Sequence, residues 1–439
     1  MDVVRTGALR RPRFPFLPIV SLRLTVVAES VHWMGVGVVL PLTLCSPISL
    51  GSGIPLVPIV PVALLIVALL TPRQADAQVA STARNGVESM RISGAAHDLS
   101  TVLWVVGFPN GRVAVGSIPA DGAVRWFDGN GRPLGRFGRS GEGPGEFRAP
   151  VTAGRFGDTL WVLDRATQRV TMIRPDPASQ PSFTTLTVPT SIEPSGALSR
   201  QVIGSVSGIV AGRRLLFQGV EVDPAVQAPS ASLHRTVIAD SAGRAVRTLK
   251  PFEPRGACQV PYVSGKTTGF VGVFFCARPI FQAGQTGEQF AVVTSDNASP
   301  VQSSFTVRLY SAEALLLFEK TMRVPAHPIP KNVADSIQRG LLERARSPEA
   351  RAARSRAKIP PAYPPVMDVV LSDAGDVWLG MAGAAALRTW IVFDIRGMRQ
   401  PDVLLPKTFR PAAVLGGDVL GTEVDPDDFI DIVRYRVGG

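Results

Sequence analysis

Three short segments contain the residue types of phosphate-binding or catalytic motifs, and each fails in its spacing or its surroundings. The glycines of GEGPGEF (141–147) could cradle a phosphate. A dinucleotide-binding loop, however, needs a strand before it and a helix after it, and strands are expected on both sides here. In the GKT of 265–267, Val260 occupies the place of the first P-loop glycine. GSVSG (204–208) lacks the Gly-x-Ser-x-Gly spacing of a nucleophile elbow. We therefore predict no catalytic residue in these segments.

The metal-ligating residue types show no transition-metal pattern. The four histidines lie far apart in the chain, and no two cysteines have the Cys-x-x-Cys spacing of a zinc site. Aspartates near expected strand ends or tight turns could bind calcium if they converged on one channel, but capping of those turns is the favoured interpretation. They are Asp158, Asp164, Asp373, Asp376 and Asp418. We predict no metal site and no cofactor, and the sequence favours a protein that is not an enzyme.

Residues 1–77 have the pattern of an export signal. Five arginines lie in its first part, Met34–Thr71 contains no charged residue, and Ala75 and Ala77 supply small residues for cleavage after Ala77. The alternatives are a start site further downstream and retention of the apolar run as a membrane anchor. The predicted organisation is therefore a signal peptide or N-terminal membrane anchor at 1–77 and a folded region at 78–439. We expect export to the periplasm or the extracellular space.

Cys258 and Cys276 are the two cysteines after the predicted cleavage site. An oxidising compartment favours pairing them. The GKTTG between them could form the turn of two neighbouring strands, which the bond would then link. Two buried free thiols are the alternative, and we predict the structural disulfide.

The formal net charge of +11 does not indicate a nucleic-acid partner. The segment 331–358 contains eight basic residues and three acidic ones, and the rest of the region after residue 77 is nearly balanced in charge. No basic stripe alternates with aromatic residues that could stack on bases. We predict that the protein binds no nucleic acid.

The same basic segment contains the one clear helical pattern of the chain. Asn332 and Asp335 resemble a capping box, and apolar residues recur at helical spacing from Val333 to Leu341. The EARAARSRAK that follows is rich in Arg and Ala and polar on all sides. We predict one helical insertion near 332–357. Its functional interpretation is a lid over one end of the fold or a basic contact surface, and a solvated decoration is the favoured alternative.

Beyond residue 98 the chain shows short apolar strands separated by turn signals, and one hairpin recurs. An apolar strand ends in Asp, a Gly follows three residues later, and another strand begins. The Asp side chain can accept hydrogen bonds from backbone N–H groups of the turn, and the Gly can adopt the positive φ that closes it. The pairs are Asp128 and Gly131, Asp240 and Gly243, and Asp394 and Gly397.

A second tight turn precedes some of these hairpins at a steady offset, which gives a four-stranded antiparallel unit. One such unit cannot bury both of its faces, so repeated units stack in a ring as the blades of a propeller. We predict an all-β fold, a six-bladed β-propeller of four-stranded antiparallel blades, in which VESMRI (87–92) completes the last blade. Five tryptophans in the strands are interpreted as core between blades. The blades are placed near 98–138, 150–188, 200–250, 264–324, 364–406 and 408–437.

Residues 135–173 resemble the six-bladed propellers of the NHL-repeat and TolB-like kind. The shared features are a Gly-rich loop that ends in Phe and Pro, a hydrophobic-x-x-Asp strand end, and an Arg-Val strand. Here they are Phe147, Pro150, Leu163-Asp164 and Arg169-Val170. The resemblance implies a six-bladed fold whose surface contacts ligands or partners. It implies no single activity, since propellers of this kind include binders, lyases and hydrolases.

These patterns predict an exported β-propeller that binds a protein, peptide or polymer of the cell envelope or the extracellular space. No motif identifies the ligand-binding residues. Membrane contact is expected only through residues 1–77, if that segment is not cleaved. The alternative function is a metal (calcium)-dependent hydrolase or lyase that acts in the central channel.

Overall fold

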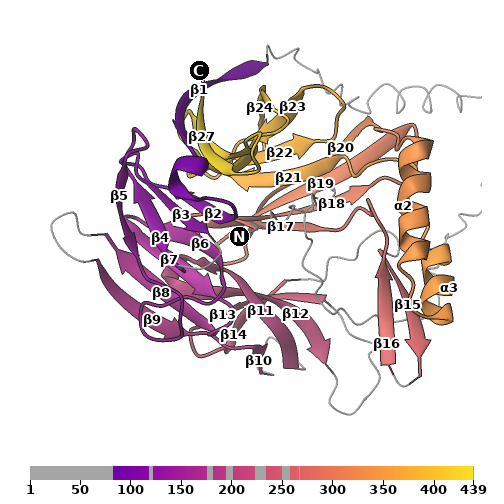
Figure 1. Ribbon diagram of the computed structural model, residues 1–439, viewed down its shortest axis with the longest axis horizontal. Coiled ribbons are helices and arrows are strands. Elements are labelled where there is room, and N and C mark those ends of the chain that lie inside the picture. Colours follow the sequence, from indigo (N-terminus) through magenta and orange to yellow (C-terminus); the bar gives the residue numbers. More distant parts are fainter. Residues whose placement is uncertain are drawn as a thin grey trace, which may run out of the picture.

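The chain folds into antiparallel β-sheets with two helices on one side (Figure 1). A computed structural model describes residues 83–117, 122–175, 181–193, 201–222, 234–249, 258–265 and 267–438. The predicted signal or anchor segment, 1–77, lies outside the described residues. Within the described ranges, no helix combines the length and the apolar composition needed to cross a bilayer.

The first half of the described chain forms three successive sheets of strands that are neighbours along the chain. The first contains β2 (Val102–Gly107), β3 (Val113–Ser117), β4 (Val124–Phe127) and β5 (Pro133–Phe137). The second contains β6 (Pro150–Phe156), β7 (Thr159–Asp164), β8 (Arg169–Arg174) and β9 (Ser182–Thr187). The third contains β10 (Ser191–Ile192), β11 (Gln201–Val210), β12 (Arg214–Val222), β13 (His234–Ala239) and β14 (Ala245–Thr248).

The second half continues in the same manner. A separate hairpin, β15 (Gln259–Ser264) and β16 (Thr267–Gly272), precedes the sheet of β17 (Ile280–Ala283), β18 (Gln289–Asp296), β19 (Gln302–Ser311) and β20 (Leu316–Pro325). After α2 (Lys331–Glu343) and α3 (Pro348–Arg356) come β21 (Val366–Leu371), β22 (Val377–Met381), β23 (Leu387–Phe393) and β24 (Arg399–Pro406). The chain ends with β25 (Arg410–Leu415), β26 (Asp418–Val424) and β27 (Ile430–Val437). Short 3-10 turns, η1 (Ala95–His97) and η2 (Ala211–Arg213), lie in two of the connections.

The first described strand, β1 (Arg84–Ile92), joins the last one. It pairs antiparallel with β27, from Gly86 opposite Val437 to Ile92 opposite Ile432. Figure 1 shows β1 beside β27. The prediction that residues 87–92 add a strand to the C-terminal unit is therefore confirmed.

Strands β21–β27 and β1 form one sheet, because β1 pairs with β24 as well as with β27. One strand of each of the preceding large sheets and the two edge strands of this last sheet contact one another in a cycle. These contacts run from β2 to β6, β11, β17, β21 and β25, and from β25 back to β2. The result is a propeller-like arrangement of antiparallel sheets around a common centre (Figure 1).

Large apolar side chains fill the spaces between neighbouring sheets. Trp104 and Trp126 pack with Val162 and Ile173, which belong to the next sheet. The five strand tryptophans are at most 8% exposed, so the prediction that they form core between blades is confirmed. They are Trp104, Trp126, Trp161, Trp378 and Trp390.

The prediction of one blade at 264–324 is wrong for the first part of that range. β15 and β16 pair only with each other among the described strands, and the sheet that follows begins at Ile280. The strand pattern is correct here, but the hairpin packs against α3 instead of joining the sheet. A period of apolar residues identifies a strand and does not identify its partner. The unit placed at 200–250 likewise starts earlier, because β10 pairs with β11.

The predicted helical insertion is two helices, and its expected cap is wrong. α2 begins at Lys331, with Pro330 in the N-cap position, so Asn332 lies inside the first turn. No side chain caps this helix. Asp335 instead accepts a hydrogen bond from Nζ of Lys331 at 2.7 Å.

Candidate functional site

The candidate site lies in a unit that two insertions build together. The first insertion contains β15 and β16 and lies between β14 and β17, and the second contains α2 and α3 and lies between β20 and β21. α3 contacts both strands of the hairpin and also α2. Figure 1 shows the two helices beside β15 and β16. We call these four elements the accessory unit.

Small side chains allow α3 to lie close against the hairpin. Ala350, Ala353 and Ala357 recur along one face of the helix and are buried, together with apolar residues of β15 and β16. The helix starts sharply because Oγ of Ser347 accepts from the Ala350 N–H at 3.1 Å and Pro348 occupies the first turn. The prediction that this stretch is polar on all sides is therefore wrong, since its alanines form a narrow buried stripe.

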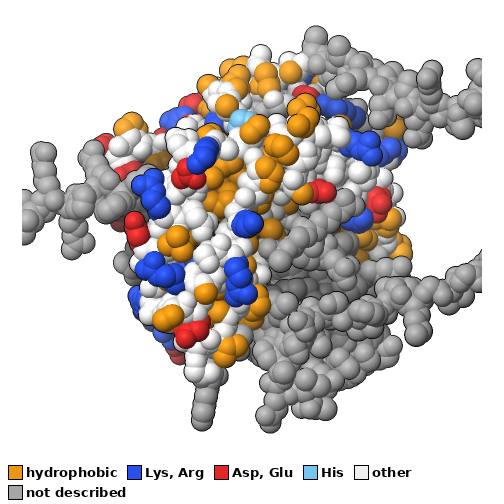
Figure 2. Space-filling model, turned by 90° about the vertical axis from the view of Figure 1, so that its right-hand side faces the viewer, with side chains coloured by type: hydrophobic (Ala, Val, Ile, Leu, Met, Phe, Trp, Pro, Cys, Tyr) orange, Lys and Arg blue, Asp and Glu red, His pale blue; other side chains and the backbone are white. Residues whose placement is uncertain are grey.

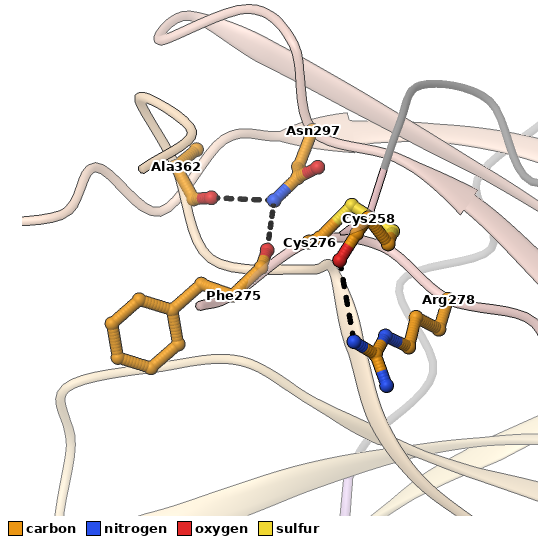
Figure 3. Close-up of a disulfide and its surroundings, with 6 residues drawn as sticks. All are labelled: Cys258, Phe275, Cys276, Arg278, Asn297 and Ala362. Carbon is orange, nitrogen blue, oxygen red and sulfur yellow. Dashed lines mark hydrogen bonds between the residues drawn. A yellow bond between two sulfur atoms is a disulfide. The ribbon is translucent and has the colours of Figure 1, made fainter. Parts of the chain in front are cut away.

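Asn297, which follows β18, ties both insertions to the ring (Figure 3). Its Nδ2 donates to the carbonyl oxygen of Phe275 at 2.8 Å and to that of Ala362 at 2.7 Å. Phe275 belongs to the first insertion and Ala362 to the second. The side chain is 5% exposed, so loss of these bonds would leave buried carbonyl oxygens unpaired. Asn297 could not be predicted from the sequence, because a single amide after a strand carries no distinctive signal.

A disulfide closes the base of the hairpin. Cys258 precedes β15 and Cys276 follows β16, and their Cα atoms are 5.4 Å apart (Figure 3). The carbonyl oxygen of Cys258 accepts from the Val273 N–H at 2.9 Å and from the Arg278 guanidinium at 3.3 Å. The two ends of the hairpin are thus joined by a covalent bond and a hydrogen-bonded bridge.

A pocket of about 670 Å³ opens between the hairpin and the turn that joins α2 to α3. The hairpin supplies an aromatic and a hydroxyl side chain, and the helices supply three guanidinium groups and one carboxylate. The lining residues are Tyr262, Ser264, Glu343, Arg344, Ala345, Arg346, Ser347, Ala350 and Arg354. Figure 2, which faces this side of the molecule, shows Lys and Arg side chains dispersed over the face among apolar and neutral ones.

A second polar group lies where the sheets meet, at the opposite end of β18 from Asn297. Gln285, in the turn between β17 and β18, donates through Nε2 to the carbonyl oxygens of Val105 at 2.6 Å and Ala412 at 3.0 Å. Its Oε1 accepts from the Gly107 N–H at 3.3 Å, and its own carbonyl accepts from the Arg155 N–H at 2.7 Å. One residue therefore binds the backbones of three other sheets.

Arg155 and Asp373 form an ion pair beside this glutamine. Arg155 lies in β6 and Asp373 in the turn after β21, and their side chains are 5% and 28% exposed. Burial raises the pKa of Asp373, and the positive charge of Arg155 opposes that shift. We call Gln285, Arg155 and Asp373 the axial cluster. It contains one carboxylate, one amide and one cation. This set links the sheets structurally, and it is not a calcium ligand set, which needs several oxygen ligands.

Three of the other candidate aspartates, Asp164, Asp376 and Asp418, have partners outside this cluster. Asp164 accepts from the backbone N–H groups of Arg148, at 2.6 Å, and Ala166, at 2.9 Å, so it caps the turns at the end of β7. Asp418 pairs with Arg436 at 3.2 Å at the start of β26. Burial raises the pKa of Asp376 in its own turn. In the part of the chain that the structure describes, no group of three His, Cys, Asp or Glu side chains is placed to hold a metal ion.

The three predicted hairpin turns share one geometry. In each, a carboxylate oxygen of the Asp accepts from the N–H groups two and four residues later, at 2.8 to 2.9 Å. The glycines have φ of 82°, 80° and 76°. The backbone bond from Arg132 lowers the pKa of Asp128, and the bond from Arg244 does the same for Asp240. The residues are Asp128, Gly131, Asp240, Gly243, Asp394 and Gly397.

No protein-family model and no curated protein matches the chain. Solved structures align with it at low similarity. A protein from Lactobacillus plantarum is 9% identical, with a TM-score of 0.29, over 76% of this chain and 84% of that one. A Bacteroides fragilis protein, provisionally described as a 6-phosphogluconolactonase, is 11% identical, with a TM-score of 0.30, over 76% and 84%. A puromycin-hydrolysing peptidase from Mycobacterium tuberculosis is 12% identical, with a TM-score of 0.34, over 81% and 55%. These values identify no family.

Proposed function

We propose that the chain is an exported binding protein of the cell envelope or extracellular space, with its ligand site in the accessory unit. The observation that carries the proposal is the contrast between the two polar regions. The axial cluster is closed on itself by hydrogen bonds between sheets. The pocket of the accessory unit is open, polar and lined by three arginines. An open basic pocket on a braced support suits the binding of an anionic ligand.

The proposal includes a six-bladed ring of the NHL-repeat and TolB-like kind. The blades would be the sheets of β2–β5, β6–β9, β10–β14, β17–β20 and β21–β24, with β25–β27 and β1 as the last. Support comes from the closed cycle of contacts among β2, β6, β11, β17, β21 and β25, which has one strand from each of these units. The ring acts as the rigid scaffold from which the accessory unit extends.

Export is supported by the leader pattern of residues 1–77 and by the disulfide, which persists in oxidising compartments. N-terminal sequencing of the protein recovered outside the cytoplasm tests this part. Cleavage after Ala77 would make Gln78 the first residue. An intact leader would instead make the protein a membrane-tethered one.

The alternative, a calcium-dependent hydrolase or lyase in the central channel, makes a different prediction. A bound calcium ion would raise the midpoint of thermal unfolding, and EDTA would lower it. We expect the purified protein to contain no stoichiometric metal and to unfold at the same temperature in calcium and in EDTA. A calcium-dependent shift of several degrees, with bound metal, would replace the binding role by the enzymatic one.

A further inference from the structure

Positive charge exceeds negative charge around the pocket of the accessory unit. Arg344, Arg346 and Arg354 line it together with Glu343, and a second carboxylate, that of Glu349, accepts a hydrogen bond from the lining Ser264 at 3.3 Å. Among the residues that the structure describes, no ion pair joins any of these three arginines to a carboxylate. The ion pair recorded for α2 and α3 joins Lys331 to Asp335, which are not in the lining. Guanidinium groups that outnumber the neighbouring carboxylates attract an anion, and its binding is electrostatically favourable.

Two of the three guanidinium groups are held in place before any ligand arrives. Nε of Arg344 donates to the carbonyl oxygen of Gly340 at 2.9 Å, and Nη1 of Arg354 donates to that of Leu341 at 2.5 Å. Both bonds use carbonyls of the last turns of α2 and occupy one nitrogen of each fork. Both arginines line the pocket, and their side chains are already fixed, so little side-chain freedom is lost on binding.

The number of guanidinium groups indicates the geometry of the anion. One arginine fork satisfies both oxygens of a carboxylate. Three forks from two segments of chain suit a group that presents oxygens in several directions, and a phosphate monoester offers three strong acceptor oxygens and close to two negative charges. The hydroxyl group of Tyr262 is a neutral donor in the same wall, whereas the Ser264 hydroxyl already donates to Oε2 of Glu349 at 3.3 Å.

We propose that this pocket binds a phosphate dianion, either inorganic phosphate or the terminal phosphate of a monoester. The inference rests on the proposed binding function and names the ligand chemistry of its site. Arg346 and Arg344 are the principal contacts, and Arg354 is the third. No covalent step is involved.

The test is titration calorimetry of the purified protein with inorganic phosphate and with glycerol 1-phosphate. Sodium chloride at equal ionic strength serves as the reference. The variants are Arg346→Gln and Arg344→Gln, each with a matched control, Arg351→Gln. Arg351 is exposed on α3 and does not line the pocket, so the control removes the same charge from the same unit. We expect each pocket variant to weaken binding about tenfold, as loss of one charge-assisted bond does, and the control to weaken it less than about twofold.

The outcomes separate this inference from the function on which it rests. If the monoester binds and inorganic phosphate does not, the ligand is a phosphorylated molecule. If both bind, free phosphate is sufficient. Equal weakening by Arg351→Gln would show general attraction to a basic surface and would overturn the site. Absence of phosphate binding above the chloride reference would also overturn it. The calcium, EDTA and N-terminal sequencing tests of the binding role would then stand unchanged.

Discussion

Arginine has different surroundings in the ring and in the accessory unit. Arg155 of the axial cluster is 5% exposed in its side chain, is paired with Asp373, and lies beside a glutamine that binds three sheets. Arg346 of the pocket is exposed, and no ion pair joins it to another described residue. The arginine side chain in the ring is buried and its charge is neutralised by Asp373. The arginine side chain in the accessory unit is in contact with solvent, and no ion pair neutralises its charge.

This difference separates a structural charge from a binding charge. A buried guanidinium needs its carboxylate, because an unpaired charge in a dry site is costly. An exposed guanidinium costs little when it is unpaired and stays available for a ligand. We therefore expect stability to depend on Arg155 and ligand binding to depend on Arg344 and Arg346. The predictions below test that division from the largest expected effect to the smallest.

Arg155→Met is expected to cause the largest loss of stability. It leaves Asp373 half-buried and without its partner, and removal of one partner of a buried pair costs about 3 kcal/mol or more. Denaturant unfolding measures the loss. In the double variant with Asp373→Asn the cost should be smaller, because no uncompensated charge remains. Arg346→Gln is the matched control. Equal losses of unfolding free energy in Arg155→Met and Arg346→Gln would contradict the separation of structural arginines from binding arginines.

Removal of the disulfide is expected to act on the accessory unit and not on the ring. Cys258 and Cys276 are 18 residues apart, and a covalent loop of this size stabilises the closed form by about 3 kcal/mol in the chain-entropy estimate. In the variant with Cys258→Ala and Cys276→Ala, backbone amides of β15 and β16 should exchange hydrogen faster. Those of β2–β5 should keep their rates. If hydrogen exchange became faster to the same extent in both regions, the accessory unit would not open independently of the ring.

The ring turns could be predicted from the sequence because their chemistry is local. An Asp that accepts from its own turn and a Gly at positive φ lie within four residues, so the pattern is visible in a short window. The turn between β26 and β27 has the same geometry, with Asp425 accepting from the Asp427 and Phe429 N–H groups. The Asp–Gly pattern does not identify this turn, because Asp428, with φ of 66°, stands where the other turns have a glycine.

The accessory pocket could not be predicted in the same way. Its wall comes from β15 and from the turn between α2 and α3, and nothing in either segment indicates that they meet. The helix and the basic residues were visible, but their contact depends on the alanine stripe of α3 and on Asn297, which bonds to both insertions. Contacts between distant segments follow from packing, and single-sequence periodicity does not encode them.

Gly397→Ala is expected to destabilise the ring more than Gly416→Ala. Both glycines have positive φ, 76° and 59°, which costs an alanine roughly 1–2 kcal/mol. A Cβ on Gly397 would also lie 2.8 Å from Cγ of Phe318, whereas nothing lies within 4 Å of one on Gly416. Thermal unfolding of the two variants isolates the steric part of the cost. Phosphate binding to the accessory pocket should be unchanged in both variants. Equal losses of stability in the two variants would show that the turn of Gly397 does not pack against Phe318.

The smallest expected effect is an alkaline weakening of ring closure. The Tyr435 hydroxyl donates to Oε1 of Glu423 at 3.0 Å, and burial, followed by the charge of Glu423, raises its pKa to about 12. The unfolded chain loses this proton near pH 10, so the folded state holds more protons between pH 10 and pH 12. The stabilisation is therefore complete below pH 10 and declines as the pH rises toward 12.

Tyr435→Phe isolates this titration from that of Tyr310, whose pKa burial also raises. Below pH 10 the variant should be less stable by about 1 kcal/mol, the net value of one hydrogen bond. The gap in unfolding free energy between the two proteins should then narrow toward pH 12. Tyr435 does not line the pocket, so phosphate binding by the folded protein should be equal in the two proteins at each pH. A gap in unfolding free energy that stays constant from pH 9 to 12 would exclude Tyr435 as the titrating group.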